Sequence, residues 1–327
     1  MNKKWIALLF SLSLCFCMSC SDSESDKKEE GKVEEEKPVT VLSKTVPLAD
    51  PYILVHDSLY YIYGTNVGTG FDVYYSKDLE YWERASALSL SHTNSYGESM
   101  FWAPEVYYVE KDKKFYMFYS TEEHICVATA DSPLGPFKQD EHKPIREEKS
   151  IDTSVFFDED GKAYLYFVRF NDGNVIWCAE LKENLEETLT QCFKAEEPWE
   201  LVLPKVVEGP SVFKQNGVYY LIYSANGYTS QDYAVGFATS DSPFGPWKKY
   251  EGNPVLHKCD GLVGVGHGAP FVDMEGKMRY VFHAHKSESE IHPRNSFVVD
   301  MFVKDSIVSL GGNIVRPMVV DRLPSGK

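Results

Sequence analysis

Two segments match almost residue for residue: "ICVATADSPLGPFKQ" (Ile125–Gln139) and "VGFATSDSPFGPWKK" (Val235–Lys249). In each, an apolar run is followed by Asp-Ser-Pro, one apolar residue and Gly-Pro. Gly and Pro interrupt regular structure, so each segment predicts a strand that ends in a tight turn. The two copies, led by Asp131 and Asp241, are 110 positions apart. A match of this quality predicts an internal repeat.

Hairpin-like segments occur along the chain with a spacing of roughly 50 residues. In "VEGPSVFKQNGVYYLIYS" (Val207–Ser224), Asn216-Gly217 separates two apolar runs, which is a strong signal for a β-hairpin. Related hairpins begin at Ala49, Ala103, Asp152 and Gly266. Aligning all five places the following residues at their heads: Asp50, Glu105, Asp152, Glu208 and His267.

Further strand-like runs follow most hairpins, including "VYYSKDLEYWER" (Val73–Arg84) and "FVVDMFVKD" (Phe297–Asp305). Five units of about four strands predict an all-β protein, a five-bladed β-propeller with four-stranded antiparallel blades around a central channel. The alternative is a β-sandwich with coincidental strand similarity. The near-identical pair of Asp-Ser-Pro segments argues against it.

Composition agrees with a large β domain and excludes some partners. The 327 residues are 43% hydrophobic, and the 21 Tyr and 19 Phe favour strands. The net charge of −16 argues against nucleic acid and anionic membrane surfaces as direct ligands. Uncharged sugars remain as candidate ligands.

The N-terminus predicts an exported protein. Residues 1–20 combine two early lysines with an apolar stretch, Trp5–Met18, as in a signal peptide. The end, "CMSC", resembles a bacterial lipobox and predicts lipidation of Cys20, although Cys17 stands where leucine is usual. Ordinary signal-peptidase cleavage is the alternative. The expected location is the outer membrane, with the protein facing either the periplasm or the cell surface.

The remaining chain divides into a tether and one domain. Residues 21–40 are acidic and lack aromatic residues, which predicts a disordered tether, and residues 41–327 form the predicted propeller. Neither candidate metal set predicts a zinc site, because the spacings do not fit or a fourth ligand is missing. These sets are Cys126, Cys178, Cys192 and Cys259, expected as buried thiols in strands, and His283, His285 and His292.

A propeller places the heads of its inner strands at one mouth of the channel. Asp50, Asp152 and Glu208 should therefore share one pocket, although they are far apart in sequence. Burial and like charge raise some carboxyl pKa values, while hydrogen bonds and cations lower others. A protonated and an ionised carboxyl together are what hydrolysis of a glycosidic bond requires.

The sequence resembles glycoside hydrolase family 43, five-bladed propellers that act mainly on arabinose- and xylose-containing polymers. The resemblance covers about Val46 to Pro317. It depends on the order and spacing of six motifs: "ADPYI", "FWAPEV", "IDTSVFFDEDGKAYLYF", "VEGPSVFKQNGVYYLIYS", "DSPFGPW" and "GHGAPF". None of them is specific alone.

The resemblance implies catalytic roles by position. Asp50 in "ADPY" matches the general base, and Glu208 in "VEGPS" matches the general acid. Asp152 in "IDTS" matches the third acid, which orients Glu208 and raises its pKa. The family inverts the anomeric centre, so the acid and base carboxyls should stand about 6.5–9.5 Å apart. The alternative for each residue alone is a turn or cap.

Secondary roles follow from the same resemblance. Trp102 matches an indole at the pocket wall, with core packing as the alternative, and Glu105 in the same motif is assigned no chemistry. His267 matches a channel histidine that, in many members of the family, helps to hold Ca²⁺ through water, and it is also expected to bind substrate. No cofactor is expected to be required. Arg294 is expected to bind sugar hydroxyls or to keep a carboxylate ionised, with a surface arginine as the alternative.

The expected function is inverting hydrolysis by a monomer, with exo-acting removal of terminal α-L-arabinofuranose from a plant oligo- or polysaccharide. A β-xylosidase, an endo-arabinanase and a galactose-releasing enzyme are alternatives within the family. A non-catalytic glycan-binding propeller is an alternative of another class, and the presence of all three acids argues against it. A retaining glycosidase of the invertase type is disfavoured because Asp50 lacks its "NDPNG"-like context.

Overall fold

The computed structural model describes residues 38–324. The predicted signal peptide, the lipidation site at Cys20 and nearly all of the predicted tether lie outside the described residues. No helix in the described part of the chain is long and apolar enough to cross a bilayer. Its only helices are three short 3₁₀ turns: η1 (His92–Asn94), η2 (Leu185–Glu187) and η3 (Pro198–Glu200).

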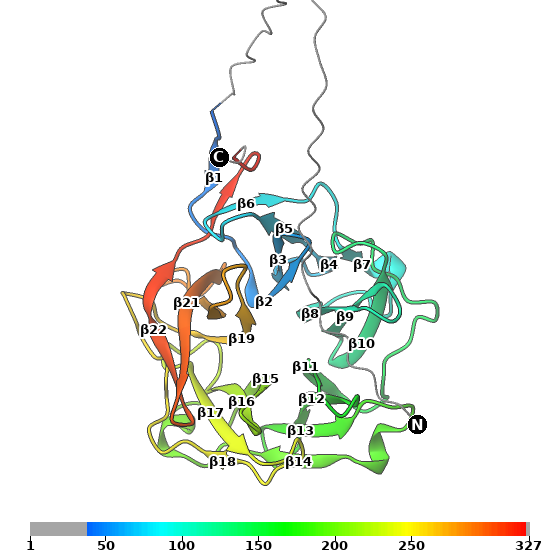
Figure 1. The fold of residues 1–327 in the computed structure, drawn as a ribbon, viewed down its shortest axis with the longest axis vertical. Helices are drawn as coiled ribbons and strands as arrows, with labels where there is room; N and C mark the ends of the chain where they lie inside the picture. Colours follow the sequence, from blue (N-terminus) through cyan, green and yellow to red (C-terminus); the bar gives the residue numbers. More distant parts are fainter. Residues whose placement is uncertain (1–37, 325–327) are drawn as a thin grey trace, which may run out of the picture. The chain divides into compact units, whose positions relative to one another are not determined.

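Five sheets surround a common axis, with the first strand of each sheet innermost (Figure 1). Blades 3, 4 and 5 are four-stranded and antiparallel. Blade 3 consists of β11 (Ser150–Phe157), β12 (Ala163–Phe170), β13 (Asn174–Glu180) and β14 (Thr190–Phe193). Blade 4 consists of β15 (Val207–Gln215), β16 (Val218–Ala225), β17 (Ala234–Ser240) and β18 (Lys248–Lys249). Blade 5 consists of β19 (Gly266–Val272), β20 (Met278–Ala284), β21 (Asn295–Lys304) and β22 (Ile307–Val315).

The prediction of a five-bladed β-propeller is confirmed, and blades 1 and 2 vary from four strands. Blade 1 consists of β2 (Ala49–His56), β3 (Leu59–Thr65), β5 (Val73–Ser76) and β6 (Tyr81–Arg84), extended by β23 (Met318–Val320) and β1 (Val41–Ser43). Blade 2 has β8 (Trp102–Val109), β9 (Lys114–Thr121) and β10 (His124–Ala130). Its fourth strand is reduced to one bridge, between Thr129 and Lys138, whereas the matching segment of blade 4 forms β18. A separate pair joins β4 (Gly70–Phe71) to β7 (Leu90–Ser91).

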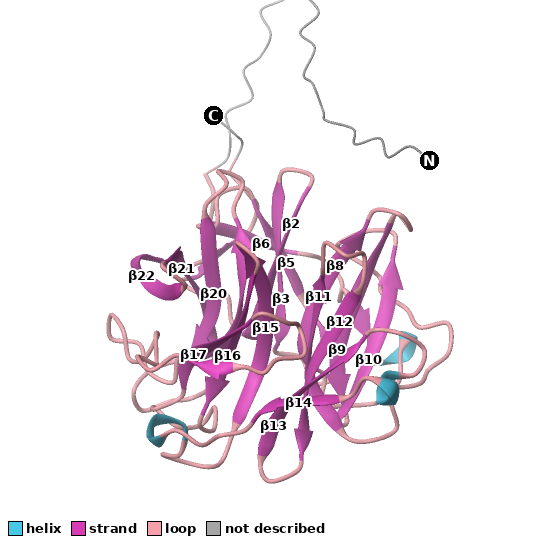
Figure 2. Ribbon diagram, turned by 60° about the horizontal axis from the view of Figure 1, so that its bottom comes forward, coloured by secondary structure: helices cyan, strands magenta, loops and turns pink. Residues whose placement is uncertain are grey.

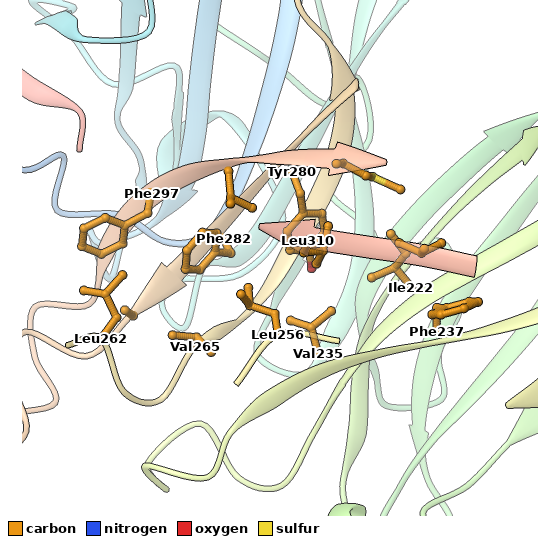
Figure 3. Packing of buried hydrophobic residues seen from close by; sticks show 14 of the residues in the cluster. Ile222, Val235, Phe237, Leu256, Leu262, Val265, Tyr280, Phe282, Phe297 and Leu310 are labelled. Atoms are coloured by element: carbon orange, nitrogen blue, oxygen red, sulfur yellow. The ribbon is translucent and has the colours of Figure 1, made fainter. Parts of the chain in front are cut away.

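Aromatic and branched side chains fill the space between neighbouring blades. Figure 3 shows Ile222 and Phe237 of blade 4 in one cluster with Tyr280 and Phe282 of blade 5. Each fully buried side chain of this size contributes roughly 1.5–3 kcal/mol. Figure 2 shows strands of successive blades side by side, with the short helical turns at the periphery. The packing therefore provides a rigid frame for the inner strands.

The cysteines are free thiols within the described residues. Cys126 on β10 and Cys178 on β13 are buried as expected, and Cys192 on β14 is partly buried. Cys259 differs from the expectation, because it lies in a loop and is partly exposed.

Each inner strand carries the same β-bulge near its start, where two residues oppose one residue of the second strand. A bulge bends the strand and redirects its side chains. The first bulge residue has a positive φ in every blade: Asp50 (50°), Ala103 (46°), Asp152 (56°), Gly209 (57°) and His267 (41°). The left-handed region is strained for non-glycine residues but is populated more often by Asp and His.

The bulges correct the alignment of strand heads. Ala103 and Gly209, instead of Glu105 and Glu208, are equivalent to Asp50. The alignment was wrong by one or two residues because it followed acidic side chains instead of the backbone kink. Glu208 is instead equivalent to Trp102, since each residue immediately precedes its bulge.

Hydrogen bonds between blades hold these bulges. The amide of a first bulge residue donates to a side chain on the second strand of the preceding blade in four blades. The pairs are Ala103 N–H to Thr65 Oγ1 (2.9 Å), Asp152 N–H to Ser120 Oγ (2.9 Å), His267 N–H to Ser224 Oγ (2.7 Å) and Asp50 N–H to His283 Nδ1 (3.0 Å). Val168 occupies the corresponding position of blade 3 and cannot accept. The Gly209 amide donates instead to Asp152 Oδ2 (3.3 Å). We call this set of bonds the latch ring.

Candidate active site

The predicted acids lie together on one cavity. Asp50, Asp152 and Glu208 come from blades 1, 3 and 4 and line a space of about 280 Å³, here called the cup. All three carboxyls are at least nine-tenths buried. Buried carboxyls need hydrogen bonds or charge partners, so the environment of each shows which protonation state it favours.

Asp50 is surrounded by cationic and hydrogen-bonding groups. Arg294 Nη1 donates to its Oδ1 at 2.9 Å, and Thr65 Oγ1 donates to its Oδ2 at 2.7 Å. The Nδ1 atoms of His267 and His283 each lie 3.3 Å from Oδ1. Burial alone would raise the pKa of Asp50, but Arg294, His267 and His283 outweigh it and hold the pKa well below its usual value. Asp50 is therefore ionised at neutral pH.

Glu208, in contrast to Asp50, is hydrogen-bonded by neutral side chains. Tyr233 Oη donates to its Oε1 at 2.8 Å, and Asn174 Nδ2 donates to its Oε2 at 2.9 Å. Burial raises the pKa of Glu208 to about 7, and the charge of Asp50 adds to this rise. The bonds from Tyr233 and Asn174 lower the pKa and limit the shift. Glu208 can therefore hold a proton near neutral pH.

Asp152 is the third carboxyl of the cup and lies on β11 of blade 3. Burial raises its pKa well above the usual value, and the charges of Glu208 and Asp50 raise it further. Since Asp152 and Glu208 repel each other when both are ionised, the pair retains a proton that two isolated carboxyls would lose. Asp152 Oδ2 also accepts the Gly209 amide, next to Glu208.

Gly209 is required at its position. Its φ is +57°, and an added Cβ would lie 2.8 Å from the His267 ring. His267 therefore packs on the strand of Glu208, while its Nδ1 stands 3.3 Å from Asp50 and 3.9 Å from Asp152. Burial lowers the pKa of His267, which keeps the ring neutral between the acids.

Arg294 and Trp102 both line the cup. Arg294 is about 10% exposed, and it contacts both Asp50 oxygens while its guanidinium lies 4.4 Å from the Tyr228 ring centroid. This geometry favours the predicted role of keeping a carboxylate ionised over that of a surface arginine. Trp102 is partly buried, lines the cup and also packs against the hydrophobic cluster of blades 3 and 4.

The family profile described as "Glycosyl hydrolases family 43" matches residues 41–300. The chain belongs to glycoside hydrolase family 43. A crystal structure described as an endo-1,4-β-xylanase from Bacteroides thetaiotaomicron VPI-5482 is 54% identical, with a TM-score of 0.83 over 86% of this chain and 99% of that one. A β-xylosidase from Xylanibacter ruminicola is 33% identical over 54% of this chain and 62% of its own length. A xylosidase/arabinosidase from Bacteroides ovatus is 28% identical over 72% of this chain and 85% of that protein.

Membership of family 43 confirms that the protein is a glycosidase. The names of its relatives differ in the sugar released, and a β-D-galactofuranosidase from Aspergillus niger is also similar, at 26% identity over 72% of this chain and 73% of that protein. The comparisons therefore establish hydrolysis of glycosidic bonds in saccharides, without one sugar.

The residues below the cup do not form a calcium site by themselves. The channel narrows to a space of about 10 Å³, lined by Asp50, Glu105, Asp152 and His267 among others. Ca²⁺ prefers six to eight oxygen ligands, whereas His267 offers nitrogen and Asp50 is bound by Arg294. No cluster of three His, Cys, Asp or Glu side chains suited to a metal occurs within residues 38–324. Calcium held through water stays a prediction.

Glu105 lies deeper in the channel than the cup. Its carboxylate accepts a hydrogen bond from the Tyr107 hydroxyl. Burial raises the pKa of Glu105 to about 8, while contacts with Tyr107, Ser154 and Val155 oppose the rise. Glu105 is therefore largely neutral at pH 7.

Several residues of the site were not predicted from sequence. They are Thr65, Asn174, Tyr228, Tyr233 and His283. Asn174 and Tyr233 begin or precede third strands of their blades, a position that no motif marks. Of these five residues, only His283 stood out in the sequence, because it lies in the "HAH" run with His285.

The three histidines considered for zinc have separate structural roles. His283 is fully buried and accepts the Asp50 amide, and burial lowers its pKa to about 3. His285 Nε2 lies 2.7 Å from the Tyr228 carbonyl oxygen and fixes that loop. His292 is exposed at the rim.

Proposed function

We propose that this glycosidase inverts the anomeric centre, with Asp50 as general base, Glu208 as general acid and Asp152 as the residue that tunes Glu208. One observation carries the proposal: the three buried carboxyls share a cavity, and their surroundings shift the pKa of Asp50 down and that of Glu208 up to about 7. Near neutral pH one cavity then holds a base and an acid at the same time.

The reaction follows from these protonation states. Glu208 gives its proton to the glycosidic oxygen as the bond from that oxygen to the anomeric carbon breaks. A water molecule attacks the opposite face of the sugar, and Asp50 accepts the proton that this water loses. The sugar leaves with inverted configuration, and proton exchange with solvent returns Glu208 to the acid and Asp50 to the carboxylate.

Nearby side chains support each step without exchanging protons. Arg294 and Thr65 hold both oxygens of Asp50 by hydrogen bonds, which directs the carboxylate. Tyr233 and Asn174 hold both oxygens of Glu208 and stabilise the anion that remains after proton transfer. Trp102 offers an indole face on which the apolar face of a sugar can stack.

The proposed substrate is a terminal α-L-arabinofuranosyl residue on a plant polysaccharide, released by exo-acting cleavage. The small volume of the cup, about 280 Å³, suits a single sugar ring. Relatives named xylosidase/arabinosidase support a pentose. Cleavage of β-1,4-xylan is the second candidate, supported by the 54% identical structure described as an endo-1,4-β-xylanase.

Aryl glycosides test the proposal directly. The wild type and Glu208→Gln are compared on the phenyl glycosides of α-L-arabinofuranose, β-D-xylose and β-D-galactofuranose, because phenol is a weak acid and leaves poorly unless the glycosidic oxygen is protonated. We expect one pentoside to be cleaved and the variant to lose about 10²–10⁴-fold in kcat/KM on substrates with poor leaving groups. Equal turnover by the variant would refute the acid assignment. NMR of the first-formed anomer tests inversion, and product length from arabinan and xylan separates exo from endo cleavage.

We also propose that the protein is exported, lipidated at Cys20 and monomeric. The support is the lipobox-like "CMSC" and the acidic segment that follows it. Mass spectrometry of the membrane fraction should find an acylated N-terminal cysteine, which Cys20→Ala removes. An unmodified soluble form from the wild type would contradict this proposal, and light scattering would measure the oligomeric state.

A further inference from the structure

His283 differs in chemistry from the other acceptors of the latch ring that lie on second strands. Each of these acceptors pairs with the residue just before the bulge of its own blade. Three of them carry a short hydroxyl side chain: Thr65, Ser120 and Ser224. A hydroxyl is sufficient to accept one amide hydrogen. The imidazole of His283 therefore adds a flat ring to a position where the bond alone does not require one.

One edge of this ring holds the backbone of the proposed base. The Asp50 amide donates to His283 Nδ1 at 3.0 Å, and both residues are buried. A buried amide without an acceptor is costly, and Asp50 already has a strained φ of 50°. Because Nδ1 accepts this hydrogen, the proton of the neutral imidazole lies on Nε2. The bond thus fixes the peptide from which the Asp50 carboxylate projects.

The face of the same ring packs on a partner of the proposed acid. Tyr233 stacks on His283 with ring centroids 5.7 Å apart and an angle of 12° between the planes, a favourable offset arrangement. Tyr233 also packs on the backbone of Gly266, where an added Cβ would lie 2.3 Å from its ring. The Tyr233 hydroxyl donates to Glu208 Oε1 at 2.8 Å. His283 therefore contacts the backbone of the base and the tyrosine that binds the acid.

We propose that His283 is a positioning residue that sets the separation of the base and the acid, holding Asp50 through Nδ1 and Glu208 through the stacked ring of Tyr233. The inference rests on the proposed function, because it assigns the supporting contacts of the same two carboxyls. Asp50 and Glu208 belong to blades 1 and 4, whereas His283 belongs to blade 5, which lies between them in the ring. An inverting enzyme depends on this separation, since a water molecule must fit between the base and the sugar.

Two substitutions of His283 separate its two contacts. In His283→Asn the side-chain oxygen can replace Nδ1 as acceptor, but the ring is lost. In His283→Phe the flat ring stays, but the acceptor is lost. His56→Phe is the control, because His56 lies at the far end of the inner strand of Asp50 and outside the cup. The His56 ring also packs on an aromatic side chain, Tyr108, with centroids 4.6 Å apart.

The leaving group distinguishes a displaced acid from a displaced base. Cleavage of a phenyl glycoside needs both groups, whereas a 2,4-dinitrophenyl glycoside needs the base alone, because its phenolate leaves without a proton. His283→Phe should lower kcat/KM about 10²-fold on both substrates, since the base is misplaced. His283→Asn should lose about tenfold on the phenyl glycoside alone. His56→Phe should leave both values unchanged.

The dependence of kcat/KM on pH gives a second readout, which a general loss of stability would not move. Without the stacked ring, Tyr233 is held less firmly and its hydrogen bond, which lowers the pKa of Glu208, weakens. The alkaline limb should therefore move to higher pH in His283→Asn and stay in place in His283→Phe. Equal losses on both substrates in His283→Asn, or an unmoved alkaline limb in that variant, would overturn the inference.

Two further measurements keep the inference separate from folding defects and from the proposed function. Nitrogen-15 NMR of the wild type should show the His283 proton on Nε2; a proton on Nδ1 would overturn the inference without any variant. Glu208→Gln should also lose more activity on the phenyl than on the dinitrophenyl glycoside. Equal losses in Glu208→Gln would reject the proposed acid, whereas a selective loss there and none in His283→Asn would reject only the role of His283.

Discussion

Tyr233→Phe provides the sharpest test of the proposed acid. Tyr233 is fully buried, and its hydroxyl donates to Glu208 Oε1 at 2.8 Å. This bond stabilises the ionised carboxylate and so lowers the pKa of Glu208. The variant keeps the ring, which stacks on His283 with centroids 5.7 Å apart, and removes only the hydroxyl. The expected effect is therefore a higher pKa of Glu208 with little change in packing.

The size of the shift follows from the hydrogen bond. A bond to a charged group contributes about 1.5–3 kcal/mol, and one pKa unit corresponds to about 1.4 kcal/mol. Loss of the bond should move the pKa of Glu208 upward from about 7 by about one to two units. Because the acid must be protonated, the alkaline limb of the profile of kcat/KM against pH should move to higher pH by the same amount.

The assay uses the pH dependence of kcat/KM on an aryl glycoside whose leaving phenol is a weak acid and so requires protonation. Tyr119→Phe is the control, because Tyr119 is equally buried and its hydroxyl has no hydrogen-bond partner among the described residues. An alkaline limb that stays in place or moves to lower pH in Tyr233→Phe would refute the role of this hydrogen bond. An equal movement of the limb in Tyr119→Phe would refute it as well.

Three further substitutions test other groups. Asp152→Asn removes a charge that repels the Glu208 carboxylate, so the alkaline limb of kcat/KM should move to lower pH; an unshifted limb would remove the tuning role. Arg294→Met takes away a cation that holds the pKa of Asp50 down, so the acidic limb should move to higher pH, measured in the same profiles. The pKa of Glu105 is about 8 in the folded state and 4.5 in the unfolded state, so the folded state favours the protonated carboxyl. The free energy of unfolding therefore falls as pH rises between these values, by up to about 5 kcal/mol above pH 8. Chemical denaturation should show a smaller loss of unfolding free energy from pH 5 to pH 8 in Glu105→Gln than in the wild type, and equal losses would contradict the burial of that charge.

The sequence was sufficient to predict the propeller and to bring its acids together. Repeated hairpins and turn residues carry that information locally, as in the paired Asp-Ser-Pro segments. The alignment of strand heads failed at Glu105 and Glu208, because a left-handed kink depends on backbone register. Ala103 occupies such a kink without any residue type that would mark it.

The partners of the acids were the least predictable part of the site. Tyr233 reaches Glu208 within the same blade and His283 reaches Asp50 from the neighbouring blade, although 233 positions separate His283 from Asp50. Neither residue belongs to a motif that specifies chemistry. Their roles depend on which side chains the closed ring of blades places in contact, and one sequence does not encode that contact in a local pattern.

The latch ring makes the position of each acid depend on the blade before it. Ser120 of blade 2 accepts a hydrogen bond from the Asp152 amide of blade 3. The Asp152 carboxylate in turn accepts a hydrogen bond from the Gly209 amide of blade 4, beside Glu208. A serine that does not line the cup thus belongs to a chain of hydrogen bonds that crosses three sheets. Improvement of such an enzyme by directed evolution should accordingly yield beneficial changes on second strands such as β9, where inspection of the catalytic pocket alone would not look for them.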